Sequence, residues 1–405
     1  MTTPNFIPGN LQWFGLAKEL VPGTPVAAPT LWVPVMAPKM VPKRNVLKDQ
    51  ALRGNMATTY GQIQGMTWSE LTYQCHLYAD TAYPHMLAVL GASDVVTGTA
   101  TTPTGTLAAA AAVGATSVSS SVSIATGTVI QIDVGGLSEV VTTTGAPTGT
   151  GPYAIPVPAL KNAHASGVAV TAVTAPFTHK NSLYNLTDAT HTAQPNTYTG
   201  FLYQGDGTVQ QIAGMVASDV KLTIKSNEKP TLDLAWTGFA GAQLAAPANT
   251  PSTAAMMPPT SGSVSIGGTG NTKYTSITID IKRVVKPIPA LTGTSNPIGI
   301  YGGPVAVTGS LDSVYKGSAD TDFAAWLANT QPALTASIYP AGDATHPMTL
   351  QMSQIAYDSG DPQPSATDWL TIQANFEAIT NATDALDGKM SPIQAQMTTL
   401  TSTSF

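Results

Sequence analysis

Apolar and polar residues alternate along much of the second half of the chain. The alternation runs over residues 220–224 and 232–236, with a turn at 227–230 between them. A repeat of two residues places one set of side chains on each face of a strand, so this stretch predicts a β-hairpin. The same repeat returns at residues 277–281, 350–352 and 370–376. Antiparallel sheets with one buried face produce this pattern, and we therefore expect an antiparallel β-sandwich or barrel.

Helical spacing appears at two places. Residues 71–77 alternate as a strand does, but over 81–90 the apolar positions share one face of a helix. Pro84 fits the first turn of this helix, and Gly91 can end it. Residues 320–327 suggest a second, short helix. The predicted fold is thus mainly β, with one flanking α-helix beside the sheets.

The first 60 residues are rich in proline. Seven prolines fall between residues 8 and 42. Because proline lacks a backbone N–H and has a fixed φ, these residues exclude a long helix and confine any strand to sheet edges or bulges. We expect residues 1–60 to form an extended N-terminal arm.

Residues 98–175 differ from the rest of the chain in composition. Thr, Ala, Gly and Ser dominate there, and three residues are charged. A hairpin is predicted over 129–143, with a two-residue glycine turn at 135–136. Further strands are expected at 153–157 and 168–173. We interpret 98–175 as a small β domain inserted into a discontinuous main domain, which consists of 1–97 and 176–405.

The 405 residues carry few charges. Charged residues make up 10% of the chain, whereas an average globular domain has about 25%. So few charges favour an exterior that is covered by other copies of the chain, although polar Thr and Ser side chains could also keep a monomer in solution. The net charge of −6 argues against nucleic-acid recognition, because that affinity comes from cations that neutralise phosphates.

The cysteine content and the hydropathy of the sequence indicate in which cellular compartment the protein is expected. Cys75 is the single cysteine, which excludes a disulfide framework and a cysteine-based zinc site. No apolar run has the length of a membrane span, and the N-terminus lacks the basic start and apolar stretch of a signal peptide. We expect neither membrane insertion nor export by the Sec route.

No residue pattern points to an active site. His76 and Asp80 are four residues apart but fall on different predicted elements, and a polar strand residue beside a helix start explains them. The glycine-rich stretch at 266–273 precedes a strand, not the helix that a phosphate-binding loop requires, so a hairpin turn explains it better. The six histidines lie at no metal-ligand spacing. We expect no enzymatic activity, no cofactor and no metal.

Charge is divided unevenly along the chain. Residues 310–389 contain ten acids and two bases. The region 39–53 contains one acid and five bases, namely Lys39, Lys43, Arg44, Lys48 and Arg53. Two such blocks can attract each other across neighbouring subunits of a head-to-tail assembly, or both can simply be solvated. Composition leaves these two alternatives open.

Several short segments, taken in order, resemble one protein family. They are Phe14–Thr24 followed by Trp32–Pro34, Arg53-Gly54, Gly65, Leu77–Thr81 followed by Leu90-Gly91, Gly214-Met215, Ser276–Arg283, Pro297-Ile298 with Tyr301–Gly303, and Phe376–Asn381 with Gly388 and Pro392–Gln394. Their order and spacing, over everything outside residues 98–175, resemble the major tail tube protein of long-tailed, siphovirus-type bacteriophages.

This resemblance implies a structural virion protein. Its copies would form stacked rings, typically hexameric, and the rings a hollow tube through which DNA reaches the host. The tube would polymerise around a tape-measure protein, end at tail terminator and distal tail proteins, and be assembled in the cytoplasm of the bacterial host. Such tubes often have acidic bores, because acids repel phosphate and let DNA pass without specific binding. The candidate lumen-facing acids are Asp233, Asp280 and Glu377.

The inserted segment at 98–175 departs from the simplest members of that family. We expect it to project from the tube exterior, because an insertion into the bore would block the channel. Two other classes of protein share features of this sequence. A secreted bacterial surface-layer or adhesin-type β protein would share the composition but need an export signal, and a tail-spike hydrolase would need paired carboxylates within a repetitive solenoid.

Overall fold

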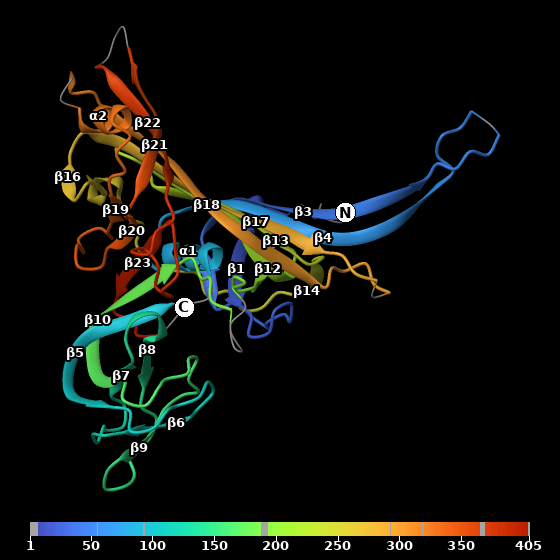
Figure 1. Cartoon of the computed structure of the whole chain (residues 1–405). Helices are drawn as coiled ribbons and strands as arrows, with labels where there is room; N and C mark the ends of the chain where they lie inside the picture. The colour runs from blue at the N-terminus through green and yellow to red at the C-terminus, as the bar shows by residue number, and fades with distance from the viewer. Residues whose placement is uncertain are drawn as a thin grey trace. The chain divides into compact units, whose positions relative to one another are not determined.

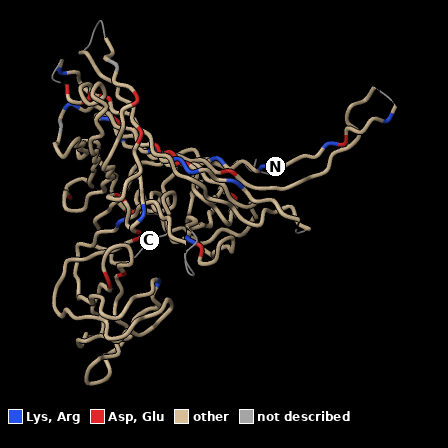
Figure 2. Tube along the Cα trace, viewed as in Figure 1, with Lys and Arg blue, Asp and Glu red and all other residues tan. Residues whose placement is uncertain are grey.

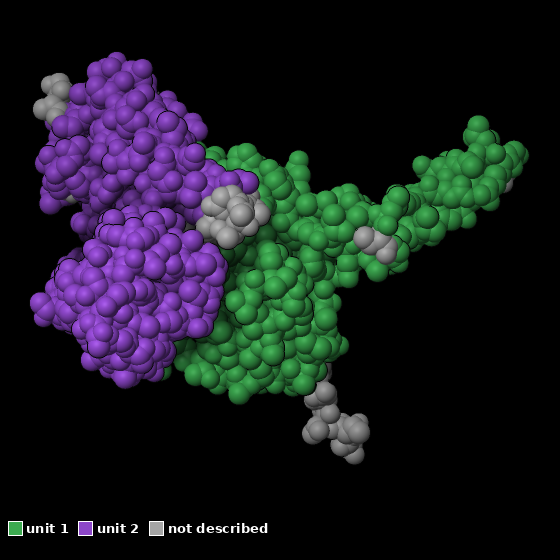
Figure 3. Space-filling model, turned by 60° about the horizontal axis from the view of Figure 1, so that its bottom comes forward, with its two compact units in different colours: residues 1–89, 194–256, 276–311 green, residues 90–193, 257–275, 312–405 purple. Residues whose placement is uncertain are grey.

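The computed structural model describes residues 7–54, 56–91, 94–187, 193–291, 293–317, 320–364 and 369–403. Contacts divide the chain into two compact units, which are coloured separately in Figure 3. Unit 1 contains residues 1–89, 194–256 and 276–311, and unit 2 contains residues 90–193, 257–275 and 312–405. Both units are mainly β, as the alternating pattern predicts.

Unit 1 is organised around an antiparallel sheet (Figure 1). The strand order is β2-β1-β11-β12-β17-β18; β12 also pairs with β13 and β14, β13 with β4, and β4 with β3. The elements are η1 (Gly9–Leu11), β1 (Trp13–Lys18), β2 (Leu31–Val33), β3 (Val35–Asp49), β4 (Gly61–His76), α1 (Ala82–Leu90), β11 (Tyr198–Tyr203), β12 (Thr208–Lys225), β13 (Thr231–Gly238), β14 (Ala242–Ala245), β17 (Tyr274–Ile288) and β18 (Gly299–Val314).

Unit 2 contains a sheet in the order β16-β15-β19-β20-β23-β10-β7-β8, with β5 paired to β10. β21 pairs with β22, and β6 pairs with β9. The elements are β5 (Val95–Thr106), β6 (Ser117–Ser120), β7 (Val129–Ile132), η2 (Gly135–Leu137), β8 (Glu139–Thr142), β9 (Tyr153–Pro156), β10 (Ala169–Ser182), η3 (Pro259–Ser261), β15 (Ser263–Ile266), β16 (Thr269–Asn271), α2 (Thr321–Leu327), β19 (Leu334–Ile338), β20 (Met348–Met352), β21 (Ile355–Gln363), β22 (Thr371–Ala378) and β23 (Gln394–Thr399). No sheet among the described residues closes into a barrel, so the sandwich form of the prediction holds.

One buried face of the unit 1 sheet accounts for the period-two alternation. Leu222 on β12 lies directly opposite Leu232 on β13 and Ile279 on β17, and all three are buried. Each such side chain stabilises the fold by roughly 1.5–3 kcal/mol relative to exposure. α1 packs on this face, where the ring of His85 contacts the rings of Tyr73 and Trp236. The predicted hairpin at 220–236 is confirmed.

Both predicted helices are present. α1 begins at Ala82 and ends at Leu90, directly before Gly91, whose φ of 145° lies in the region that favours glycine. α2 begins after Asp320, whose side chain accepts hydrogen bonds from the backbone N–H groups of Asp322 and Phe323. This is the usual chemistry of a helix N-cap.

The proline-rich N-terminal segment contributes strands to unit 1. β1 pairs with β11 and β2 inside the sheet, whereas β3, among the described strands, pairs with β4 alone. The pairing of β3 shifts register between Met36 and Lys39, around Ala37, whose φ is 44°, and Pro38. Proline thus lies on an edge strand and at a bulge, as its missing N–H requires. The hairpin β3–β4 extends well beyond its neighbours in the sheet (Figure 1); we call residues 35–76 the hairpin arm.

The glycine turn predicted at 135–136 is wrong in length. β7 and β8 do form a hairpin, but residues 133–138 connect them through the 3-10 turn η2. Gly136 lies so close to the backbone oxygen of Leu386 that a Cβ at this position would be 2.1 Å away. A contact with a residue far away in the sequence of unit 2 therefore shapes the loop. A rule for turns that considers only neighbouring residues cannot predict such a contact.

The segment 98–175 has a core of its own. Buried residues between Leu107 and Val170 pack together, including Ile130, Ile132 and Ile155. β5 and β10 run without interruption through residues 98 and 175, so the change in composition falls inside two strands and not at loops.

Candidate functional surfaces

The polar face of the unit 1 sheet brings together two of the three predicted lumen-facing acids. Lys221 on β12 lies opposite Asp233 on β13 and Asp280 on β17, while Gln74 on β4 lies opposite Asp233. Residues paired directly across an antiparallel sheet point to the same face. The four side chains therefore form one row across four strands, which we call the polar row. Gln74 Nε2 donates to Asp233 Oδ1 at 2.7 Å.

A second pair of charges borders the polar row. Asp219 on β12 lies opposite Lys282 on β17, and Lys282 Nζ lies 2.6 Å from Asp280 Oδ2. Burial, and then the neighbouring Asp280, raise the pKa of Asp219 to about 6. The side-chain hydrogen bond to Asp280 raises the pKa of Lys282. The polar row and its border thus carry three acids interleaved with two lysines, so this part of the face is mixed in charge.

Asp219 was not among the sequence candidates. The sequence could have indicated that Asp219 shares the face of Lys221, because the two residues are two positions apart on an alternating strand. The bulge between Ala217 and Asp219 and the register with β17 decide that it meets Lys282 and Asp280. That register is a long-range property.

Glu377 belongs to unit 2, not to the polar row. It is exposed on β22, opposite Ala356 of β21. Gln373 and Asn375 alternate with buried residues on the same strand. Glu377 therefore lies at the end of a row of polar side chains whose other members are uncharged amides.

The five predicted basic residues all lie on the hairpin arm, but only some are exposed and unpaired. Lys43 Nζ lies 3.1 Å from Glu70 Oε2 across the arm, and Arg53 forms an ion pair with Asp49 while its guanidinium lies 4.7 Å from the ring centre of Tyr60. The remaining three are exposed, and no ion pair joins them to any described residue: Lys39, Arg44 and Lys48.

The outer half of the arm also exposes apolar side chains. Leu47 and Ile63 lie opposite each other and are 55% and 68% exposed. Leu52 and Met56, in the loop between β3 and β4, are fully exposed. Clusters of this kind mark interaction sites on soluble proteins. The sequence prediction for the arm considered charge alone and missed them, although the apolar pair Val46-Leu47 interrupts the basic pattern visibly.

The edge of β3 adds backbone groups to this surface. An edge strand offers unpaired N–H and C=O groups to another chain, and proline or lysine on the strand limits such pairing. Pro38 and Pro42 lie in the inner part of β3, whereas residues 45–49 contain no proline. The part of the edge without proline, which Lys48 alone guards, therefore coincides with the apolar outer half of the arm.

Cys75 lies on β4, and Asp80 lies just before α1. Asp80 Oδ2 accepts a hydrogen bond from Ser252 Oγ at 2.5 Å, and Cys75 is fully buried. Burial, and then Asp233, raise the pKa of the Cys75 thiol to about 12, so the thiol stays protonated near neutral pH. Gly267 and Gly268 form the hairpin turn between β15 and β16, with φ of 58° and 78°, as the sequence predicts.

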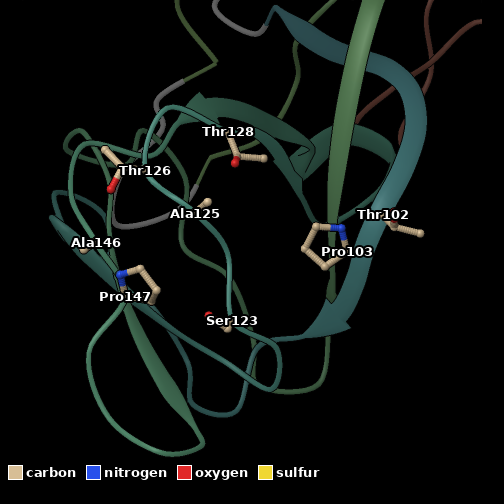
Figure 4. A pocket seen from close by; sticks show the side chains of 8 residues that line it. All are labelled: Thr102, Pro103, Ser123, Ala125, Thr126, Thr128, Ala146 and Pro147. Atoms are coloured by element: carbon tan, nitrogen blue, oxygen red, sulfur yellow. The ribbon is translucent and has the colours of Figure 1, made fainter.

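A hollow in the segment 98–175 is lined by side chains with few functional groups. Figure 4 shows eight lining side chains, all of them small or hydroxyl-bearing: Thr102, Pro103, Ser123, Ala125, Thr126, Thr128, Ala146 and Pro147. They provide neither a charge nor an aromatic surface. Figure 2 shows how sparse charged residues are along the whole trace. Within the described ranges, no group of three or more His, Cys, Asp or Glu side chains could hold a metal ion, and no described helix is long and apolar enough to cross a membrane.

Comparison with known families matches residues 9–378 to the family described as phage tail tube protein. The match includes the whole hairpin arm and parts of both units, and it ends before β23. No curated protein matches the chain.

Proposed function

Because this chain belongs to the family of phage tail tube proteins, we propose that its copies assemble into stacked, hexameric rings that form the hollow tube of a siphovirus-type tail. DNA passes through the tube into the host. The family match over residues 9–378 carries this proposal. The family match supports a structural role for the protein.

The hairpin arm is the proposed contact between subunits. Its exposed Leu47 and Ile63 would be covered by a neighbouring copy, and about 25 cal/mol for each Å² of apolar surface removed from water would favour that contact. Lys39, Arg44 and Lys48 would meet acids of the neighbour, and such charge pairing fixes register and orientation more than affinity. Paired Lys43 and Arg53 would contribute less.

The polar row is the proposed lumen surface. Its acids repel phosphate, while Lys221 and Lys282 neutralise part of the charge, so DNA would meet a surface with little net attraction. Glu377 is proposed to add a further acid. Neither strong repulsion nor binding would then slow the passage of DNA.

The segment 98–175 is proposed to decorate the tube exterior as an inserted domain, separate from 1–97 and 176–405. Its own apolar core supports independent folding. Thr97 on β5 pairs directly with Thr178 on β10, so residues 98–177 can be replaced by Asn-Gly, which favours a two-residue hairpin turn. The shortened chain is expected to form tubes of smaller diameter in electron micrographs. Loss of assembly in a folded shortened chain would refute the exterior placement.

The tube is proposed to polymerise around a tape-measure protein, between tail terminator and distal tail proteins, in the cytoplasm of the bacterial host. The mature protein would then reside in the virion tail. Immunogold labelling of virions along the tail shaft tests this location, and labelling confined to the capsid would contradict it.

Electron microscopy of the purified protein tests assembly itself. We expect rings or tubes with an open axis. The double variant Leu47→Asp with Ile63→Asp should remain folded by circular dichroism but stay monomeric, because two new charges would be buried in the subunit contact. Val134→Asp is the matched control, since Val134 is 67% exposed on the segment 98–175. If the wild-type chain stays monomeric at high concentration and within virions, the proposed function is wrong.

A further inference from the structure

A buried group of charges in unit 2 has no part in the surfaces described above. Lys273 directly precedes β17, and its Nζ lies 2.6 Å from Asp320 Oδ1 and 2.8 Å from Asp322 Oδ2. The three side chains are 2%, 0% and 1% exposed. One amine therefore faces two carboxylates where water is excluded. Such burial of charge is costly and requires compensation.

The two carboxylates are held in different ways. Asp322 accepts hydrogen bonds from Tyr274 Oη, at 3.0 Å to both oxygens, and from Tyr357 Oη at 3.3 Å. Burial, and then Asp322, raise the pKa of both tyrosines, so their hydroxyls remain hydrogen-bond donors. These bonds orient Asp322 beside the amine without using the carboxylate of Asp320.

Asp320 lies closest to the amine and is held by the backbone. Its Oδ1 accepts from the N–H of Asp322 at 3.0 Å, and its Oδ2 faces the N–H of Lys316 at 3.4 Å. Backbone N–H groups directed at a carboxyl oxygen stabilise the negative charge that develops there when a nucleophile adds to the carbon. The carboxyl carbon of Asp320 is thus next to the amine and polarised.

We propose that Lys273 and Asp320 become joined by an intramolecular amide bond, with Asp322 carrying the proton during the reaction. Burial raises the pKa of Asp320, but the hydrogen bond and charge of Lys273 outweigh it and lower that pKa overall. A proton must therefore move before the amine can react, and fixed proximity replaces an encounter in solution. The amine is the nucleophile, as buried lysines are elsewhere in protein chemistry. No metal, oxidant or activated reagent is required.

The reaction is balanced within the three side chains. Asp322 first accepts a proton from the Lys273 ammonium and passes it to an oxygen of Asp320, and the free amine then adds to Cγ of this neutral carboxylic acid. The Nζ–Cγ bond forms and one Cγ–O bond breaks, so that oxygen leaves as water with two of the three ammonium protons. The third proton stays on the amide nitrogen, and Asp322 ends as the carboxylate it was at the start. The second oxygen of Asp320 becomes the amide oxygen.

The bond would close a loop of 47 residues between the start of β17 and the start of α2. A cross-link of this kind restricts the unfolded chain and so stabilises the folded state. It would also hold the ends of that loop together under mechanical load. This inference does not depend on the proposed function.

Mass spectrometry of the purified full-length chain tests the bond. The intact mass should be lower than the sequence mass by one water, and proteolysis should release a branched peptide that contains both Lys273 and Asp320. Lys225 and Glu228 are the internal control, because they lie 3.1 Å apart but are exposed, and their peptides should stay unlinked. An intact mass equal to the sequence mass, or a lost water that maps to another site, would overturn the proposal.

Variants separate the roles of the two carboxylates. Asp320→Asn should reach the same final mass as the wild type, because its amide leaves as ammonia. Asp322→Asn should keep the full, unlinked mass, since its side chain cannot carry the proton. Lys273→Arg should also remain unlinked. If these variants fail to fold, peptide mapping of the wild-type chain still decides whether the bond is present. A linked Asp322→Asn chain would contradict the role given to Asp322.

Discussion

His85 Nε2 lies 2.9 Å from the hydroxyl oxygen of Tyr73 on the sheet of unit 1, and both side chains are buried. His85 Nδ1 lies 2.5 Å from the backbone oxygen of Thr81. The ring is therefore neutral, with Nδ1–H donating to Thr81 and Nε2 accepting from Tyr73. Protonation would place a positive charge in an apolar core and would require the Tyr73 hydroxyl to turn from donor to acceptor. Burial lowers the pKa of His85 to about 4.

This histidine makes unit 1 sensitive to acid. The folded pKa of about 4 lies below the unfolded value of about 6.5, so protons bind the unfolded chain more readily between these limits. Stability is unaffected above about pH 6.5 and falls as the pH decreases towards 4, by up to about 3 kcal/mol. Urea unfolding at a series of pH values measures this. His85→Phe should reduce the slope, and an unchanged slope in that variant would contradict the assignment.

His179 gives unit 2 the opposite dependence. Its Nδ1 lies 3.0 Å from Asp94 Oδ2 and its Nε2 lies 2.9 Å from the backbone oxygen of Thr401. Burial lowers the pKa of His179, but the hydrogen bond and charge of Asp94 outweigh it and raise the pKa overall. The stabilisation is complete below the unfolded pKa and is lost as the pH rises through the folded one. The protection factors for hydrogen exchange at residues 399–403, which correct for the intrinsic pH dependence of exchange, should therefore decrease in alkaline buffer.

Removing the partner of His179 tests the same contact. Asp94→Asn should cost about 3 kcal/mol at pH 6, because it leaves a buried charge without its counter-ion. Glu228→Gln, which breaks the exposed pair with Lys225, should cost about 1 kcal/mol or less. Urea unfolding of the two variants measures both losses of unfolding free energy. Equal losses would show that the buried pair contributes no more to stability than the exposed pair.

Gly136 is predicted to tolerate no side chain. A Cβ there would lie 2.1 Å from the backbone oxygen of Leu386, and backbone cannot move aside as a flexible side chain does. Gly136→Ala should destabilise the fold by roughly 3 kcal/mol. Gly270→Ala is the control, since no atom lies within 4 Å of its Cβ position. Thermal melts of the two variants should differ clearly; coincident melts would refute the contact.

Reversing charge on the polar row tests the proposed lumen. Tubes of Asp233→Lys with Asp280→Lys should retain DNA fragments at low salt and release them as salt increases, because Lys binds phosphate by displacing counter-ions. Asp206→Lys with Glu228→Lys places the same charge change on exposed turns elsewhere in unit 1. Co-sedimentation of tubes with short DNA measures retention inside and out. Equal retention by both variants would place the polar row outside the bore.

Much of the fold was predictable because its signals are local. The period of two in 220–236 and the helical spacing of 81–90 depend on residues a few positions apart, and so does the capping of α2 by Asp320. The prolines of β3 likewise excluded a central strand through their own missing N–H groups. Asp233 and Asp280 could be assigned to polar strand faces for the same reason.

Other features depended on residues far apart in the chain, and no local rule contains them. The register of β12 with β13 and β17 put Lys221 between Asp233 and Asp280, and it brought Asp219 to Lys282. The backbone of Leu386 reshaped the loop at Gly136. Folding also carried Lys273 to two acids that follow it by 47 and 49 positions. Alternation states which face a side chain occupies, whereas the identity of its neighbour is decided only when distant strands pair and exclude water between them.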